Sequence, residues 1–305
     1  MIKINNISKS FGQIKALDDI SINMSKGKLT IIAGADGAGK STIFKIILGL
    51  LKKDSGSILL NDIDIESDYS KITSICGYMP EKFSLYQDLT VEENLNFFAD
   101  IRNVPKKRRE ELKYRLLENT GMAKFKKRRA GALSGGMKQK LSLATILLSS
   151  PEIIILDEPT TGVDPLSRIE FFNIIDSLKD EGKTIVISTP YLDEAEKGDY
   201  IIFMKNGKNI KSDTIEKLKA NQKFKIFNII PKGNIFDILL KLKGEEKHNK
   251  RAFIKGEYIK YMADMSTEAS ELSFIPHLSI EREEPKLEDI YLYYERLYTD
   301  KNKTE

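Results

Sequence analysis

The sequence has few of the residues that form disulfides or histidine-based sites. Its 305 residues include one cysteine, Cys76, and two histidines, His248 and His277. One cysteine excludes an internal disulfide, which suits the cytosol, and the apolar neighbours of Cys76 predict a buried structural thiol. The histidines have no metal-ligand spacing and no nucleophile beside them, so we expect both to be structural or exposed.

Long hydrophobic runs are also missing. No apolar stretch approaches the roughly 18–20 residues that a membrane-spanning helix requires. The first residues, Met1 to Ile4, lack the pattern of a secretory signal peptide. We therefore expect a cytoplasmic chain. If it serves a membrane process, another chain has to span the bilayer.

Neither sign of charge dominates the chain. The net charge is +4, from 49 basic and 45 acidic residues, and this near-balance does not indicate nucleic-acid binding. Residues 102–129 are uneven, because they hold twelve Lys or Arg residues against three Glu residues. Such a segment is either a solvated helical face or a region attracted to an anionic surface, such as lipid of the cytoplasmic leaflet.

One glycine-rich stretch fits the pattern G-x-x-x-x-G-K-[ST] of phosphate-binding loops. Before it, residues 29–33 are apolar and indicate a buried parallel strand, and after it residues 43–48 indicate a helix. This strand–loop–helix order is the context that the pattern requires. The loop consists of Gly34, Ala35, Asp36, Gly37, Ala38, Gly39, Lys40, Ser41 and Thr42.

The residue types in this loop suit a bound triphosphate. Its three glycines let backbone N–H groups point inward, and the N-terminus of the following helix favours an anion. Lys40 supplies a mobile positive charge for the β- and γ-phosphates, and Ser41 offers a hydroxyl to Mg²⁺. We therefore expect ATP and Mg²⁺ at this loop. Upstream, Phe11 lies on an expected loop, where it either stacks on adenine or packs into the core.

A second helix start carries glycines as well. Ser134, Gly135 and Gly136 precede a helix predicted over residues 137–149. Its free N–H groups suit another anion. One phosphate is not easily held by two loops a hundred residues apart in one compact domain, so we expect this helix start to serve a neighbouring subunit.

Two carboxylates follow the apolar residues 153–156. Asp157 would lie at the carboxyl end of a buried strand, where it can hold Mg²⁺ through water. Glu158 is placed to orient or deprotonate an attacking water. A helix-capping pair is the alternative for such a dipeptide, and the phosphate loop favours the catalytic interpretation.

The order of these motifs resembles that of the ATP-binding cassette (ABC) family over residues 1 to about 215. The resemblance implies that two cassettes pair head to tail, with each ATP held between the phosphate loop of one and the Leu-Ser-Gly-Gly signature of the other. It places Phe11 on adenine, Asp157 on Mg²⁺ and Glu158 on the catalytic water. The partner's ATP would be bound by Ser134, Gly135 and Gly136, and Asp164 would lie at the dimer contact.

Two positions depart from the family pattern. Glu81 stands where the family usually has a Gln that touches Mg²⁺ and the transporter, so the resemblance places Glu81 at Mg²⁺ with Ser41 and Asp157. Pro190 stands where the family usually has a His that binds the γ-phosphate. Proline offers no donor to the phosphate. We therefore predict that the chain's own site hydrolyses slowly or mainly holds ATP. The intact signature would serve a competent site on a different cassette, which favours a heterodimer over a homodimer.

Three further stretches indicate which subfamily of ABC ATPases the chain resembles. Residues 77–86 and 189–196 resemble ATPases of type-2 exporters, in particular the first cassette of tandem exporters that work with membrane-fusion adaptors. Residues 284–292 resemble the closing segment of those ATPases. Residues 219–305 are therefore expected to form their small accessory domain.

These observations lead to one expected architecture. The fold is expected to be α/β: a P-loop NTPase with a mixed sheet core, an antiparallel β edge and a helical signature-bearing insert at about residues 78–135. That cassette would occupy residues 1–218, and a small α+β accessory domain would occupy residues 219–305.

The expected function is that of the ATP-binding and hydrolysing subunit of an ABC exporter. Its expected partners are membrane-spanning permease subunits, a second ABC ATPase and a membrane-fusion adaptor, with no nucleic acid. It would lie peripherally on the cytoplasmic face through the permease. The alternatives are a soluble ABC ATPase acting on ribosomes or DNA, and an ATP sensor without turnover. A single cassette without a charged linker or long coiled coil disfavours the first, and Glu158 disfavours the second.

Overall fold

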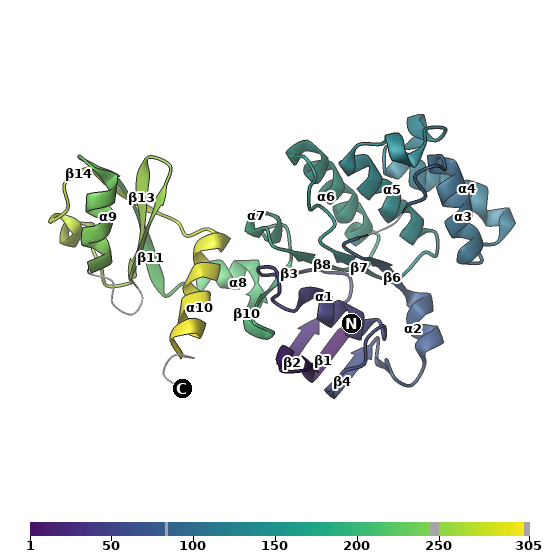
Figure 1. Ribbon diagram of the computed structural model, residues 1–305, viewed down its shortest axis with the longest axis horizontal. Helices are drawn as coiled ribbons and strands as arrows, with labels where there is room; N and C mark the ends of the chain where they lie inside the picture. Colours follow the sequence, from purple (N-terminus) through teal and green to yellow (C-terminus); the bar gives the residue numbers. More distant parts are fainter. Residues whose placement is uncertain (83–84, 245–249, 302–305) are drawn as a thin grey trace. The chain divides into compact units, whose positions relative to one another are not determined.

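The computed structural model describes residues 1–82, 85–244 and 250–301, and the chain divides into two compact units, Met1–Ser212 and Asp213–Glu305 (Figure 1). The domain boundary expected at residues 218 and 219 stays a prediction. In the described part of the chain, no helix combines the length and apolar character needed to cross a bilayer.

The first unit is built on a six-stranded sheet in the order β10-β9-β3-β8-β7-β6. The four strands β3, β8, β7 and β6 run in parallel, as do β3 and β9, and their apolar residues are buried because the sheet is covered on both faces. The strands are β3 (Leu29–Ala33), β6 (Cys76–Met79), β7 (Ile153–Asp157), β8 (Thr184–Thr189), β9 (Tyr200–Lys205) and β10 (Lys208–Thr214).

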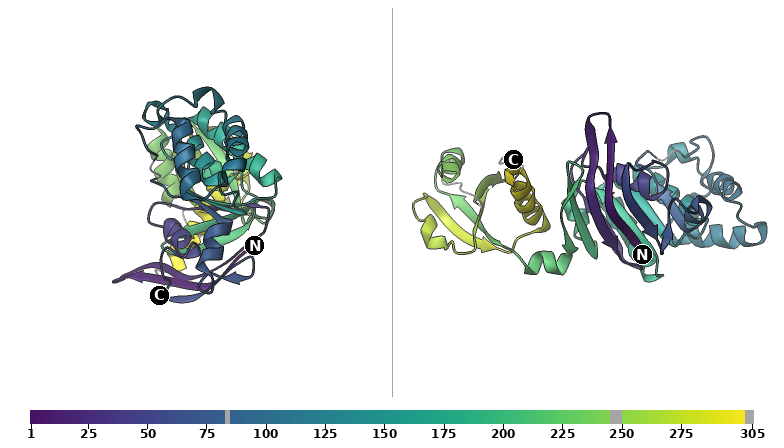
Figure 2. Two further views of the ribbon diagram at one scale, coloured as in Figure 1. Left: turned by 90° about the vertical axis from the view of Figure 1, so that its right-hand side faces the viewer. Right: turned by 90° about the horizontal axis from the view of Figure 1, so that it is seen from below.

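A second sheet, in the order β2-β1-β4-β5, is antiparallel. Its strands are β1 (Ile2–Phe11), β2 (Ile14–Met24), β4 (Ser55–Leu60) and β5 (Ile63–Asp64), and β1 and β2 form the long hairpin visible in Figure 2. Helix α1 (Lys40–Ile47) lies between the two sheets (Figure 1). Ile4, Phe44 and Ile155 join one buried core around this helix. The phosphate loop, which links β3 to α1, is therefore anchored by both sheets.

The other face of the six-stranded sheet is covered by helices (Figure 1). They are α2 (Tyr69–Ile75), α3 (Val91–Ile101), α4 (Lys106–Asn119), η1 (Ala123–Phe125), η2 (Ala130–Ala132), α5 (Gly135–Leu147), α6 (Pro165–Asp180) and α7 (Leu192–Ala195), of which α2 lies at the sheet's β6 edge. A capping box begins α3: the Thr90 hydroxyl accepts from the Glu93 amide at 3.2 Å, and the Glu93 carboxylate accepts from the Thr90 amide at 2.7 Å.

The second unit is an α+β arrangement with the antiparallel sheet order β12-β13-β11-β14. Helix α9 packs Ile238 and Leu242 into the core on one face. On the other, α10 stacks Tyr293 on Phe224 with ring centroids 4.8 Å apart. The elements are α8 (Ile215–Ala220), β11 (Phe224–Pro231), α9 (Ile235–Gly244), β12 (Arg251–Lys255), β13 (Tyr258–Asp264), η3 (Ala269–Leu272), β14 (His277–Glu283) and α10 (Leu287–Lys301).

The structure corrects three details of the sequence interpretation. The sequence predicts one strand over residues 74–79 and another over residues 251–262. Residues 74 and 75 instead belong to helix α2, whose start is capped by the Asp68 carboxylate through the Lys71 amide at 2.9 Å. Residues 251–262 form a hairpin instead of one strand, with Gly256 at φ +63° in its turn. Phe11 is the last residue of β1 and not part of a loop. His248 lies outside the described residues.

The remaining expectations on fold class hold. The chain has an α/β fold with a mixed sheet core, an antiparallel sheet at its edge and a C-terminal antiparallel sheet. Cys76 is buried, as expected, and burial raises the pKa of its thiol to about 12.

Candidate functional site

The phosphate loop requires glycine at two positions for packing reasons. A Cβ on Gly34 would lie 2.3 Å from the Met204 carbonyl oxygen, and one on Gly39 would lie 2.6 Å from that of Ala16. Gly39 also has φ +101°, a conformation that L side chains avoid. The chain thus runs tightly against β9 and β2 before it enters α1, which leaves the helix N-terminus free for an anion.

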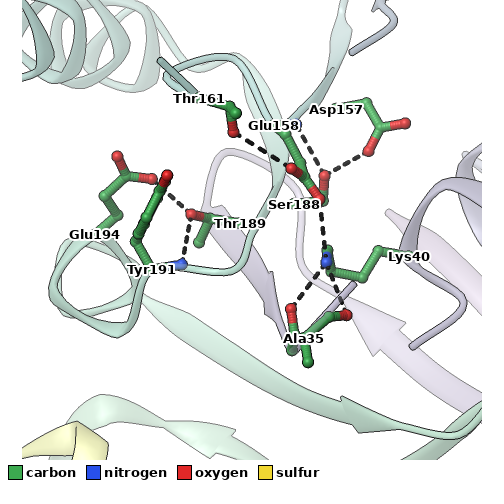
Figure 3. A network of polar contacts seen from close by, with 10 residues as sticks. Ala35, Lys40, Asp157, Glu158, Thr161, Ser188, Thr189, Tyr191 and Glu194 are labelled. Carbon is green, nitrogen blue, oxygen red and sulfur yellow. Dashed lines mark hydrogen bonds and ion pairs between the residues drawn. The ribbon is translucent and has the colours of Figure 1, made fainter. Parts of the chain in front are cut away.

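Lys40 is buried, and its ammonium group has three protein contacts (Figure 3). It donates to the carbonyl oxygens of Gly34 at 2.8 Å and Ala35 at 3.1 Å, and it lies 3.1 Å from the Glu158 carboxylate. An ammonium group has three donors. Phosphate oxygens therefore have to replace at least one of these partners when they reach Lys40.

Asp157 and Glu158 occupy the end of β7, and a serine on β8 holds both. The Ser188 hydroxyl donates to Asp157 at 2.6 Å and accepts from the Glu158 amide at 2.9 Å. Glu158 has φ +48°, which is strained for a residue with a side chain. The two bonds to Ser188 hold the turn that aims the Glu158 carboxylate at Lys40 (Figure 3).

A hollow of about 530 Å³ opens over the phosphate loop. Glu81 and Glu158 reach it from β6 and β7, and three residues from the β1–β2 hairpin and one from the turn before β10 complete its wall. The lining residues are Ile14, Lys15, Ala16, Asp36, Gly37, Gly39, Lys40, Ser41, Thr42, Glu81, Glu158, Thr161 and Asn206. The structure thus brings together six phosphate-loop residues with the carboxylates of Glu81 and Glu158.

The composition of this site fits a magnesium nucleotide. Ser41 lines the hollow with its hydroxyl-bearing side chain, and Asp157 supplies carboxylate oxygens at the end of β7. Oxygen ligands suit Mg²⁺, which is usually held by one or two carboxylates together with substrate phosphates. Among the described residues, no group of three or more His, Cys, Asp or Glu could hold a metal alone.

Phe11 is not among the described residues that line this hollow. Its ring is half exposed and has the Lys9 ammonium 5.6 Å from its centroid. Ile14, which follows the turn and is also exposed, lines the hollow instead. Sequence interpretation named Phe11 and missed Ile14, because only the register of the hairpin shows which residue faces the loop.

The signature residues form a second cluster. The Ser134 hydroxyl caps α5 through the Met137 amide at 3.3 Å, and the Asp164 carboxylate caps α6 through the Ser167 amide at 2.9 Å. That amide lowers the pKa of Asp164. Gly136 packs so closely on Ser167 that a Cβ would lie 2.4 Å from it. In the described part of the chain, none of Ser134, Gly135, Gly136 and Asp164 lines the phosphate-loop hollow.

A buried carboxylate that sequence interpretation missed joins three segments around the site. Glu194 on α7 accepts hydrogen bonds of 2.6 Å from the hydroxyls of Thr160 and Thr189. The Arg168 guanidinium lies 3.7 Å from it and stacks on the Tyr191 ring. Thr189 directly precedes Pro190, so Glu194 fixes the turn that carries this proline (Figure 3). The one sequence signal was three acidic residues among positions 193–196.

Known proteins resemble this chain over about two thirds of its length or more. The family model described as ABC transporter matches residues 17–161. The chain is 44% identical over 209 residues to "Probable multidrug ABC transporter ATP-binding protein YbhF" of Escherichia coli, which covers 68% of this chain and 36% of that protein. It is 39% identical over 230 residues to "Lantibiotic transport ATP-binding protein SrtF" of Streptococcus pyogenes, covering 73% of this chain and 97% of that protein.

A solved structure gives the same result for the fold. The dimeric structure of MJ0796, described as a bacterial ABC transporter cassette, superposes with a TM-score of 0.64 at 28% identity and covers 70% of this chain and 99% of that one. The alignment with YbhF spans about a third of that protein, so its activity as a whole does not transfer directly. The phosphate loop, the Asp157–Glu158 strand end and these similarities agree: the chain belongs to the ATP-binding cassettes of ABC transporters, a family of ATPases.

Proposed function

We propose that this chain is the ATP-binding and hydrolysing subunit of an ABC exporter. The observation that carries the proposal is the position of Glu158, whose carboxylate lies 3.1 Å from the Lys40 ammonium in the hollow over the phosphate loop. A carboxylate there is within reach of a water that approaches the γ-phosphate.

In this proposal the loop residues 34–42 hold the phosphates, and Phe11 lies beside the adenine. Ser41 and Asp157 hold Mg²⁺, which when bound would neutralise part of the phosphate charge. Glu158 takes a proton from water. The water oxygen then bonds to the γ-phosphorus, and the bond to the β-phosphate oxygen breaks to release ADP. Ser188 keeps Glu158 aimed and Asp157 oriented throughout.

Two cassettes would share each ATP. The signature residues and Asp164 lie outside the chain's own hollow, around the N-termini of α5 and α6. A helix start with free N–H groups suits the phosphate of another molecule. The dimeric structure of the MJ0796 cassette supports such a pairing. The partner is proposed to be a different ABC ATPase, because this chain has Pro190 where the family usually has the histidine that binds the γ-phosphate.

The chain's own site is proposed to be degenerate. Glu81 adds a negative charge to a hollow that must receive a triphosphate, and Pro190 carries no donor for the γ-phosphate. Both changes weaken stabilisation of negative charge. ATP held at this site can still close a dimer, since closure needs only a higher affinity for ATP in the closed state.

Pro190 also favours a second candidate function, an ATP sensor that binds without turnover. Glu158→Gln separates the two functions in the purified chain. For an ATPase, slow phosphate release should fall at least about 100-fold, while ATP affinity stays within about threefold, since glutamine has nearly the same shape. Equal phosphate release by wild type and variant would favour the sensor.

Export and the remaining partners rest on the relatives. YbhF and SrtF are described as multidrug and lantibiotic transport proteins, which supports a transporter, with residues 219–305 as its proposed accessory domain. The chain would sit on the cytoplasmic face, docked on a permease through the surface around residues 81–88, of which 83 and 84 lie outside the described residues. A membrane-fusion adaptor is a further proposed partner.

A tagged pull-down from native membranes in mild detergent tests these partners. A polytopic permease together with a second cassette that carries Ser-Thr-His would support the heterodimeric exporter. A permease without a second cassette would indicate a homodimer. Ribosomal proteins or DNA without a membrane protein would contradict the transport proposal and leave the ATPase.

A further inference from the structure

Two adjoining hollows lie in the first unit, and in the described chain neither is lined by a phosphate-loop residue. One, of about 350 Å³, opens between α4, α5, α6 and the turn before β8. The other, of about 360 Å³, lies between the ends of α2, α3 and α5 and the start of α4. Arg108 and Ser150 line both, so the two hollows adjoin at these residues. We call the two adjoining hollows the basic groove.

Positive charge dominates the groove. Arg102, Arg108, Arg115 and Lys183 line it, and Glu181 is the one carboxylate among its lining residues in the described chain. Arg108 and Arg115 are seven residues apart on α4, so two helical turns place them on the same face. The uneven charge of residues 102–129 is thus partly directed into a concave surface.

Two other cations on α4 have carboxylate partners. Arg109 lies 2.7 Å from Asp100, and Lys113 lies 2.8 Å from Glu110. No described carboxylate lies within 4.0 Å of the charged groups of Arg102, Arg108, Arg115 or Lys183. The groove cations therefore have no neutralising carboxylate among the described residues.

Arg102 is the most informative member of the groove. It is half-buried, and among the described residues its guanidinium has one hydrogen-bond partner, the Ser149 hydroxyl at 3.2 Å. Loss of water around this guanidinium lowers its pKa. A partly buried cation without a carboxylate is costly to a fold, and an anion in the groove would offset that cost.

The groups in the groove match a phosphate. Guanidinium forks pair with phosphate oxygens in a bidentate manner, and hydroxyls such as that of Ser150 add single donors. Leu116, Leu147 and Leu178 form an apolar wall at the α4–α6 end, which suits the carbon skeleton next to such a group. We propose that the basic groove binds an anion that carries a phosphate group, at a site separate from the ATP site.

Two sources of that group are tested in parallel. Calorimetry with glycerol 3-phosphate tests a soluble phosphate ester, and sedimentation with vesicles of 30% phosphatidylglycerol in phosphatidylcholine tests a lipid headgroup. The full chain carries Lys40→Ala throughout, so that the phosphate loop contributes little. The test variant is Arg108→Ala with Arg115→Ala. The matched control is Lys106→Ala with Lys107→Ala, which removes the same charge from the same helix outside the groove.

We expect one of the two probes to bind, with an affinity that falls at least tenfold in the groove variant and less than threefold in the control variant. Arg102→Ala should weaken binding of the same probe. No binding of either probe overturns the proposal. Equal losses in both double variants also overturn it, since they would indicate attraction to the helix surface and not to the groove. Circular dichroism of each variant checks that the fold is retained, and none of these outcomes depends on ATP hydrolysis.

Discussion

Pro190 follows Thr189 at the carboxyl end of β8, and Glu194 holds this turn through the Thr189 hydroxyl at 2.6 Å. The turn that carries residue 190 is therefore held by a contact that does not involve the side chain at that position. We expect Pro190→His to raise ATP turnover at this chain's own site by about tenfold or more, because one preorganised donor to the developing charge is worth roughly 100- to 1,000-fold. Phosphate release by the complete assembly measures it.

Pro190→Ala is the matched control for that substitution. It removes the ring, as histidine does, but adds no donor, so turnover should stay near the wild-type value. A gain in both variants would mean that proline limits motion and not charge stabilisation. A lack of gain in Pro190→His, in every assembly tested, would contradict the degenerate-site proposal.

Cys76 gives a second prediction at the scale of one residue. Burial, and then the charge of Glu152, raise the pKa of its thiol to about 12, and only the thiolate reacts with alkylating agents. We expect iodoacetamide at pH 8 to modify the folded chain at least about 100-fold more slowly than the urea-unfolded chain. Mass spectrometry of timed samples measures the rate. Comparable rates would show that the thiol is accessible.

The same thiol makes stability depend on pH. An unfolded thiol ionises near pH 8.5 and the folded one near pH 12, so between these values the folded state holds more protons. Stability relative to Cys76→Ala should therefore fall as pH rises above about 9, by roughly 1.4 kcal/mol per pH unit. Parallel curves for the two proteins would contradict the raised pKa.

At the scale of elements, Glu194 connects α7 with β8, α6 and the turn after β7. Both of its carboxylate oxygens accept short hydrogen bonds, and it is 3% exposed. We expect Glu194→Gln to lower the free energy of unfolding by about 2 kcal/mol, because hydrogen bonds to buried charged groups are worth roughly 1.5–3 kcal/mol. Urea unfolding followed in the first unit measures it.

Asp193→Asn is the control for the hydrogen bonds of Glu194 to Thr160 and Thr189, which we call the Glu194 clamp. It makes the same carboxylate-to-amide change one residue away on an exposed side chain, where an effect within about 0.5 kcal/mol is expected. If both substitutions destabilise equally, the loss of charge near the start of α7 is responsible and the clamp is not.

The elements also show what sequence can and cannot predict. Helix α3 was predictable because its capping box is local, and β3, β7 and β8 were predictable because continuous apolar runs indicate buried parallel strands. The strand β6 was predicted two residues too early, because residues 74 and 75 belong to α2, whose start depends on one aspartate cap. Ser188 could not be identified, since its role arises from its pairing with Asp157 across β7 and β8.

At the scale of the whole molecule, the motif order was enough to predict a cassette followed by a second α+β unit. The separation of the phosphate-loop hollow from the signature cluster was predictable as well, because one phosphate cannot be served by both. The basic groove was not, since Arg102, Arg108 and Lys183 come from three elements that only the packed first unit brings together.

The separation of the phosphate-loop hollow from the signature cluster gives the last prediction. In a heterodimer with one degenerate site, Ser134→Arg should block the competent site on the partner and lower the turnover of the purified assembly at least about tenfold, since loss of a single donor costs roughly 100-fold or more. Lys40→Ala affects this chain's own slow site, so more than half of the turnover should remain. In a homodimer both substitutions act on equivalent sites and should abolish turnover alike. Thr90→Ala is the control for stability, because it removes a helix cap of similar worth, about 1 kcal/mol, from α3.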